Sequence, residues 1–353
     1  MREGQEYLLG LSLIPDLGNV RIKLLLEHLG SPRLIWQMSE REVRALKLPS
    51  SVQNSFLENR KKIDLAREFD DVITNGVTLL TLSDDNYPPL LKEIYDPPAV
   101  LYIKGKLNPT SLKIGVVGTR LMTAYGHQLT QSLTQSLVAS GLTIVSGLAR
   151  GVDSLAHRST LQSGGVTVAV LGSGLNRIYP AENKHLAEEI TQKGAVISEY
   201  ALNCEATRGT FPARNRIISG LCLGVLVTEA GEDSGSLITA NAALEQGRHV
   251  FSVPGPINSR QSVGTNSLLK IGAKLVTGAD DILEELNLEG VSAREMTPIT
   301  GDTPDEVSVL NILSLEPFHI DDLARATKIP AGKLGGVLTV MVISGKVSDL
   351  GGG

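Results

Sequence analysis

Residues 114–151 read IGVVGTRLMTAYGHQLTQSLTQSLVASGLTIVSGLARG. The apolar run Ile114–Val117 ends at a glycine, a helical pattern covers Tyr125–Ala139, and a second apolar run covers Thr143–Val145. Short continuous apolar runs separated by a helix are typical of parallel strands that are buried on both faces of a sheet. The stretch therefore predicts a strand–helix–strand unit of an α/β domain.

The same alternation continues to about residue 287. Further strands are expected at 166–171, 196–198, 224–227, 250–253 and 274–276, and further helices at 152–162, 184–191 and 237–246. Crossovers between parallel strands of one sheet are right-handed. We therefore expect an extended Rossmann-like, doubly wound and mostly parallel sheet as the central domain, over residues 71–287.

The segment before this domain predicts helices. Residues 1–70 carry apolar residues at helical spacing, and one such run ends at Gly30. The turn Pro15-Asp16-Leu17-Gly18 could belong to a helix-hairpin-helix that offers N–H groups to a phosphate. A plain helical bundle is favoured, because charges nearly cancel here and no basic face stands out. Residues 71–112 read as a proline-rich connector with one strand at Val100–Ile103.

The segment after it predicts a linker and a small domain. Residues 288–304 hold Gly290, Pro298, Gly301 and Pro304 among polar residues, and residues 305–353 fit three short helices and the start of a hairpin, as in a winged helix. The chain stops at Gly351-Gly352-Gly353, where the return strand of the wing should follow. The segment from Gly301 has seven acidic and four basic residues, so we expect it to contact protein and not DNA.

Composition excludes several classes of protein. No apolar run is long enough to span a bilayer, residues 1–10 lack the features of a signal peptide, and the two cysteines show no metal spacing. A cytoplasmic protein without a metal or other cofactor is therefore expected. The net charge of −5 argues against a general nucleic-acid binder, yet residues 101–126 contain four basic residues and no acid, and residues 206–220 contain three and none.

Four expected strand ends are rich in glycine and small polar residues. They are Gly118-Thr119-Arg120, Ser146-Gly147-Leu148-Ala149-Arg150-Gly151, Gly172-Ser173-Gly174, and Thr228-Glu229-Ala230-Gly231 continued by Ser234-Gly235-Ser236. Ligands of open parallel sheets bind at these strand ends, and glycine together with a following helix start suits an anion. Any strand-to-helix turn can need glycine, but four such loops on one edge favour an anion site.

The identity of the anion is narrowed by what the loops lack. Neither G-x-G-x-x-G nor G-x-x-x-x-G-K-[ST] is completed, so NAD and ATP are disfavoured. Phe211-Pro212-Ala213-Arg214-Asn215-Arg216 suits a single strand of nucleic acid, because arginines meet phosphates and an aromatic face meets a base. The pattern alone leaves open that Phe211 is a core residue and that the arginines pair with acids.

Three titratable residues are candidates for catalysis. His157 follows Asp153 by one helical turn and Glu229 ends a strand, so these residues could do acid–base chemistry. Such a pair more often ties a helix start to a loop, and we favour that interpretation. No nucleophile elbow or metal cluster accompanies these residues, so we expect a binding protein and not an enzyme.

Taken together, these motifs resemble the DprA/Smf family of DNA-processing proteins over nearly the whole chain. The most specific segment is Phe211–Leu221. Other family-typical stretches are Tyr87-Pro88, Asp96–Tyr102, Val117–Arg120, Ser146–Asp153, Ala156-His157, Leu171–Gly174, Tyr179-Pro180, Asn183-Lys184, Ser198–Tyr200, Ser234–Thr239 and Val253–Gly255. The truncated wing departs from the family pattern.

The resemblance implies a sterile-alpha-motif-like helical domain, a Rossmann domain, a winged helix and no catalytic activity. It implies a recombination mediator that binds incoming single-stranded DNA in natural transformation, forms a homodimer through the Rossmann domain and loads RecA. By position, Arg120 and Lys184 match phosphate contacts of the family, and DNA contact is extended to Phe211, Arg214, Asn215 and Arg216.

Two other functions remain open at this point. Glu229 and Gly235-Ser236 also resemble the arrangement in lysine-decarboxylase-like phosphoribohydrolases, which would make the chain a nucleotide-processing enzyme. A nucleotide-sensing adaptor, whose loops hold a small ligand while the winged helix signals, is the third interpretation.

Overall fold

The computed structural model describes residues 4–288, 301–313, 318–344 and 346–347. The chain divides into two compact units, residues 1–292 and 293–353, which are treated separately below. The expected linker at 288–304 falls largely outside the described residues.

The first unit begins with a small helical bundle. Its helices are α1 (Gln5–Ser12), α2 (Gly18–Leu29), α3 (Pro32–Gln37), α4 (Glu40–Ala45), α5 (Ser50–Arg60) and α6 (Leu65–Thr74). Helix α2 ends at Gly30, whose φ of 70° is one that glycine adopts readily, and α4 begins with a capping box between Ser39 and Glu42. Leu8, Leu11 and Phe56 are buried at the centre of the bundle.

The start of α2 faces the protein's own sheet. Asn19 accepts a hydrogen bond from the backbone N–H of Ala99 at 3.0 Å and donates one to Glu199 at 3.0 Å. The side chain of Asn19 therefore ties the start of α2 to residues 99 and 199 of the same chain. The plain bundle with a tight turn is the interpretation that fits this structure.

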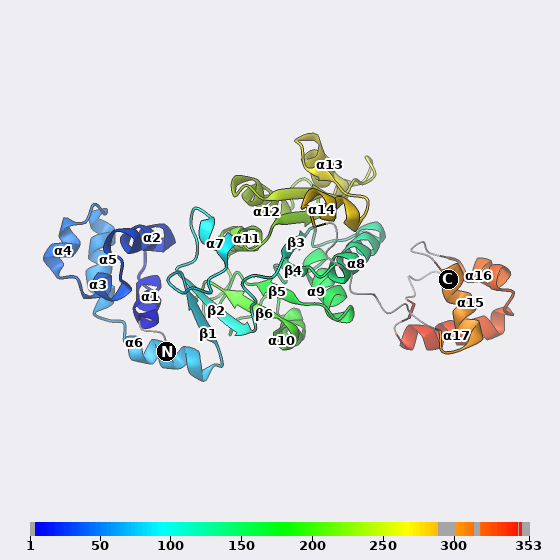
Figure 1. The fold of residues 1–353 in the computed structure, drawn as a ribbon, viewed down its shortest axis with the longest axis horizontal. Coiled ribbons are helices and arrows are strands. Elements are labelled where there is room, and N and C mark those ends of the chain that lie inside the picture. Colours follow the sequence, from blue (N-terminus) through cyan, green and yellow to red (C-terminus); the bar gives the residue numbers. More distant parts are fainter. Residues whose placement is uncertain (1–3, 289–300, 314–317, 345, 348–353) are drawn as a thin grey trace. The chain divides into compact units, whose positions relative to one another are not determined.

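A nine-stranded sheet follows, in the order β1-β2-β6-β5-β4-β3-β7-β8-β9 (Figure 1). The strands are β1 (Thr78–Thr81), β2 (Val100–Gly105), β3 (Lys113–Val117), β4 (Thr143–Ser146), β5 (Thr167–Val170), β6 (Ala195–Ser198), β7 (Gly224–Val227), β8 (His249–Ser252) and β9 (Lys274–Leu275). Strands β3 to β9 pair in parallel, whereas the β1–β2 and β2–β6 pairings are antiparallel. The extended Rossmann-like fold is confirmed.

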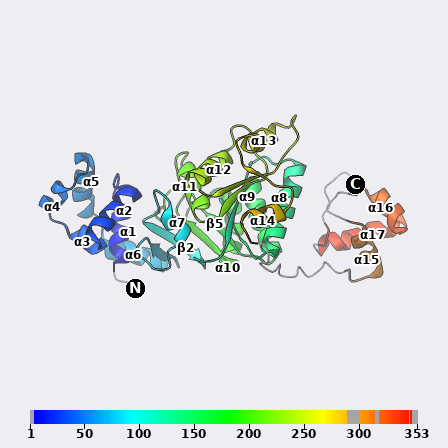
Figure 2. The same cartoon turned by 45° about the horizontal axis from the view of Figure 1, so that its top comes forward.

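Helices cover both faces of this sheet (Figures 1 and 2). They are α7 (Pro89–Glu93), α8 (Ala124–Ala139), α9 (Val152–Gln162), α10 (Lys184–Lys193), α11 (Thr210–Gly220), α12 (Gly235–Glu245), α13 (Val263–Lys270) and α14 (Ala279–Glu285), with short 3-10 turns at Ala181–Asn183 and Arg260–Ser262. Helices α8, α9 and α14 share one apolar core, and α11 and α12 share another. From β3 the strands are added toward β6 on one side, and from β7 they are added toward β9 on the other, so the β3–β7 pair marks the topological switch point.

The connector predicted at 71–112 is more ordered than expected. Besides the predicted strand, it contains β1 and α7, and its two strands extend the sheet. Proline did not prevent α7, because Pro89 occupies the first turn, where a helix needs no N–H donor.

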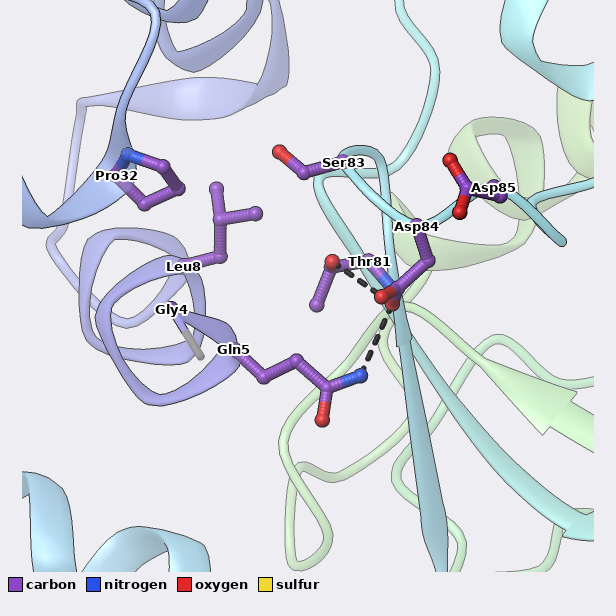
Figure 3. A pocket seen from close by; sticks show the side chains of 8 residues that line it. All are labelled: Gly4, Gln5, Leu8, Pro32, Thr81, Ser83, Asp84 and Asp85. Carbon is purple, nitrogen blue, oxygen red and sulfur yellow. Dashed lines mark hydrogen bonds between the residues drawn. The ribbon is translucent and has the colours of Figure 1, made fainter. Parts of the chain in front are cut away.

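The outer edge of β1 is closed by side chains (Figure 3). Asp84 accepts hydrogen bonds from the backbone N–H of Thr81 at 2.7 Å, from the Thr81 hydroxyl at 2.9 Å and from Gln5 of α1 at 3.0 Å. The Gln5 amide also reaches the carbonyl of Leu79 at 3.5 Å. These residues border a cavity of about 230 Å³ between the bundle and the sheet. The bonds occupy main-chain groups that an open edge strand would present to another chain.

The second unit contains three helices among its described residues, α15 (Pro304–Ile312), α16 (Ile320–Thr327) and α17 (Ala331–Ile343). They pack around Val309, Leu323, Leu334 and Met341. The return strand of the wing, expected after Gly353, is not among the described residues. No single described helix is long and apolar enough to cross a membrane, and only α16 with α17, as a bent pair, would match by length and composition.

Candidate nucleic-acid interface

The four glycine-rich loops meet at one edge of the sheet, because they follow the neighbouring parallel strands β5, β4, β3 and β7. Three of these strand-end loops bond directly to one another. The N–H of Thr119 donates to the carbonyl of Glu229 at 2.7 Å, and the N–H of Val152 donates to the carbonyl of Thr119 at 3.1 Å. The predicted convergence of the loops is therefore present.

The glycines of these loops have two different roles. A Cβ on Gly118 would lie 2.6 Å from Val152, and one on Gly147 would lie 2.5 Å from the Arg214 guanidinium. Gly151 adopts a φ of 78° and leaves no room for a side chain beside Thr119. These three glycines allow the loops to pack. Gly235 instead has nothing within 4 Å and lies open at the start of α12.

The small polar residues of the site also divide into packed and open groups. Ser146 is buried and donates to the carbonyl of Val116 at 2.6 Å, and Thr119 donates to Gln261 at 3.2 Å, so both hold backbone segments together. Asn215 donates to the carbonyl of Gly235 at 3.2 Å. The hydroxyls of Ser234 and Ser236 lie 2.7 Å apart beside it. Ser234 and Gly235 are the less buried residues of this second group and lie at the start of α12, where a helix favours an anion, whereas Asn215 and Ser236 are buried.

Arg214 is a buried residue whose side chain bonds the ends of strands β4 and β5. Its side chain is 4% exposed and donates to the carbonyls of Gly147 and Val170, which end two neighbouring strands. Burial lowers the pKa of Arg214 to about 10, although Asp153 opposes the shift. The sequence predicted that this guanidinium contacts phosphate. Its buried position does not fit that prediction, because its N–H groups donate to main-chain carbonyls instead.

Arg216 belongs to the joint with the helical bundle. Its guanidinium bonds Asp96 and Glu199, each at 2.6 Å, and only 13% of its side chain is exposed. Of the two interpretations that the sequence left open, pairing with nearby acids therefore applies to Arg216.

The surface of the strand-end loops carries a cation and two aromatic rings. Arg120 is exposed, and its guanidinium carbon lies 5.7 Å from the centroid of the Phe211 ring. The Phe211 ring is only partly buried and lies against Gly172, where a Cβ would come within 3.1 Å of it. The ring centroid of Tyr179 is 5.5 Å from that of Phe211. Phe211 therefore contributes to the surface as well as to packing.

Two further basic residues border this surface. Arg150 is exposed and forms a two-bond pair with Glu182, at 2.6 and 2.7 Å. Lys184 is exposed at the start of α10, and its neighbour Asn183 donates to the carbonyl of Leu148 at 2.9 Å, which ties this helix start to the loop after β4. Glu182 was not anticipated from the sequence, since nothing in the pattern links it to Arg150.

The basic stretch at 101–126 does not assemble into one patch. Lys113 begins β3 and is buried, at the opposite end of the strand from Arg120. Burial lowers the pKa of Lys113 to about 8. Strand β2 runs antiparallel, so Lys104 also lies toward the amino-terminal edge of the parallel strands. Only Arg120 from this stretch reaches the strand-end loops.

The residues considered for acid–base catalysis have structural partners. Glu229 is 2% exposed and accepts from the N–H and hydroxyl of Thr123, which caps α8. Asp153 accepts from the N–H groups of Gly147 and Ala149, as expected of a residue that ties a helix to a loop. His157 is fully buried, bonds Thr167 at 2.7 Å, and has a pKa lowered by burial to about 3.

No cluster of His, Cys, Asp or Glu within the described ranges could hold a metal ion. The fold and site define a class of protein: a Rossmann-like protein whose strand-end loops lack nucleotide fingerprints and carry exposed arginine and aromatic side chains.

The comparison with family models identifies the member of this class. The model "DNA recombination-mediator protein A" matches residues 78–287, and the model "DprA winged helix domain" matches residues 293–353. The chain belongs to the DprA family of recombination mediators, also called Smf.

Individual relatives agree with this assignment. The chain is 40% identical to DNA processing protein DprA of Bacillus subtilis, over 72% of this chain and 84% of that protein. The X-ray structure of DprA from Streptococcus pneumoniae matches with a TM-score of 0.70 and 36% identity, over 81% of this chain and 99% of that one. A structure of DNA processing protein A from Helicobacter pylori, reported for its single-stranded DNA binding mode, also matches, with a TM-score of 0.55 and 33% identity. The match covers 60% of this chain and 96% of that one.

Proposed function

We propose that this chain binds single-stranded DNA across its strand-end loops, without sequence preference and without catalysing a reaction. The observation that carries the proposal is the contact between the exposed Arg120 and the partly buried Phe211 beside Gly172. A cation beside an aromatic ring suits a sugar-phosphate chain with unpaired bases. The single-strand binding described for the Helicobacter pylori relative supports the same ligand.

Exposure divides the residues expected from the sequence into two groups. We propose that Arg120, Lys184, Arg208 and the start of α12, with Ser234 and Gly235, meet the strand. Gly118, Thr119, Ser146, Gly147, Gly151, Arg214 and the buried Asn215 and Ser236 are proposed to support the loops. Arg150 would join the contacts once released from Glu182. Arg216 is assigned to the joint with the bundle.

Binding of an oligothymidine and of a duplex of equal length, compared over a salt series, tests this function. We expect tighter binding of the oligothymidine and a fall of log affinity with log salt of about 0.7 per neutralised phosphate. Equal or stronger binding of the duplex would contradict it. Hydrolysis of a nucleoside monophosphate that is lost in Glu229→Ala would instead support the enzyme alternative.

We further propose that the protein acts in the cytoplasm and loads RecA onto the bound strand in natural transformation, as its family assignment supports. RecA-driven strand exchange on DNA coated with single-strand-binding protein should accelerate when the chain is added. The acidic winged helix is proposed to contact protein. Deleting the segment from residue 289 should leave oligothymidine affinity within about twofold, and a larger loss would contradict this assignment.

A homodimer is proposed through the Rossmann-like domain. Strand β9 is the second edge of the sheet, and apolar side chains are exposed on it and on the neighbouring α13: Leu275 is 47% and Ile271 is 69% exposed. An exposed apolar group at a sheet edge is suited to a second copy. Sedimentation should show a dimer that Ile271→Glu converts to a monomer. A wild-type monomer at tens of micromolar would contradict the proposal.

A further inference from the structure

Tyr179 is the most accessible aromatic ring at the strand-end loops. It is 50% exposed, and its ring lies 5.5 Å from that of Phe211 at an angle of 47°. The proposed function assigns this residue no task.

Phe211 offers little free ring surface for a base. The Arg120 guanidinium lies over the ring at 5.7 Å, and the backbone at Gly172 lies close to its edge. Tyr179 also packs against this ring, at a tilt of 47°. Since a base must contact an open ring face to stack, the ring available to an incoming base in this structure is that of Tyr179.

A cation lies beside this pair of rings. Arg120 contacts Phe211, and Phe211 contacts Tyr179, so these three side chains form a row. Arg150, which pairs with Glu182, is close enough to Tyr179 for the phenol to help raise the pKa of the guanidinium, after the larger effect of Glu182. Aromatic rings beside cations suit a single strand, whose bases stack while its phosphates meet the positive charge.

We propose that Tyr179 stacks an unpaired base of the bound strand, beside the Arg120–Phe211 contact. This inference rests on the proposed function and adds a residue that selects single strands. Bases of a duplex are stacked on their neighbours and leave no face for a protein ring.

The test uses Tyr179→Ala and Tyr179→Phe in the full chain, with fluorescence anisotropy on an oligothymidine and on an abasic strand that has the same number of phosphates. Tyr179→Ala should raise the Kd for oligothymidine about 5- to 140-fold, the range that one stacked base contributes. It should leave the Kd for the abasic strand and the salt slope unchanged. Tyr179→Phe should bind within about twofold of wild type, because it keeps the ring.

Tyr95→Ala is the matched control, because Tyr95 is 81% exposed and is not part of this row. Unfolding temperatures of all variants exclude a loss of fold. The inference is overturned if Tyr179→Ala binds oligothymidine like wild type, if Tyr179→Phe is as weak as Tyr179→Ala, or if the loss persists on the abasic strand. Failure of the proposed function is distinct, since wild type itself would then not bind oligothymidine or would prefer duplex.

Discussion

Replacing Arg120 by alanine removes one exposed guanidinium from the strand-end loops. Arg120, Lys184 and Arg208, the three basic residues proposed to meet the strand, are exposed, while Arg150 is paired with Glu182. Three proposed phosphate contacts predict a salt slope near −2 for an oligothymidine, at about 0.7 per contact. Arg120→Ala should reduce its magnitude by about 0.7 and weaken binding about fivefold at 0.1 M salt and about 15-fold at 0.02 M.

The assay is a titration of labelled oligothymidine at several salt concentrations, with Arg67→Ala as control. Arg67 is exposed on α6, so its replacement by alanine removes the same charge from the helical bundle. Its slope should equal that of wild type. Loss of affinity without a change of slope in Arg120→Ala would refute Arg120 as a phosphate contact, as would an equal effect in Arg67→Ala.

Three further outcomes follow from the same contacts. Glu182→Gln should release Arg150, tighten oligothymidine binding by up to about fivefold and steepen the salt slope by about 0.7, and unchanged binding would place Arg150 outside the DNA path. Arg214→Lys should lower the free energy of unfolding in urea by about 2–4 kcal/mol, since main-chain carbonyls lose donors, and a loss below about 0.5 kcal/mol would contradict its structural role. Because burial keeps His157 neutral in the folded state, with a pKa of about 3, the unfolded chain binds more protons below about pH 6.5, and stability should be lost as pH falls from there toward 3. Thermal unfolding of His157→Gln should show a shallower loss between pH 6.5 and 4 than wild type, whereas the exposed His185→Gln should not.

The parallel sheet could be predicted from the sequence because each of its strands is a separate apolar run. Helix α9 has the predicted bounds, Val152–Gln162, and most strands differ from their predicted bounds by one residue. Strand β1 was missed, since it has only four residues and lies in a stretch that was read as a connector. An edge strand has a neighbouring strand on one side only. On the other side of β1, the side chain of Asp84 takes the place of a strand as a hydrogen-bond partner.

The site was harder to predict, for a geometric reason. Arg214 and Arg216 were treated as one phosphate-binding pair, yet both lie on α11, where residues two apart point in different directions. One therefore enters the strand ends and the other reaches the bundle joint. The row of Arg120, Phe211 and Tyr179 joins residues far apart in the chain, and no local pattern records such a contact.

The seal that Gln5 and Asp84 form over β1 has a consequence for shortened versions of this protein. A chain that starts after the bundle keeps Asp84 but loses Gln5, so the carbonyl of Leu79 is left without that donor. We expect such an exposed edge strand to pair with strands of neighbouring molecules, which leads to aggregation. In the full chain, the helical bundle therefore helps to cover the edge strand of the sheet.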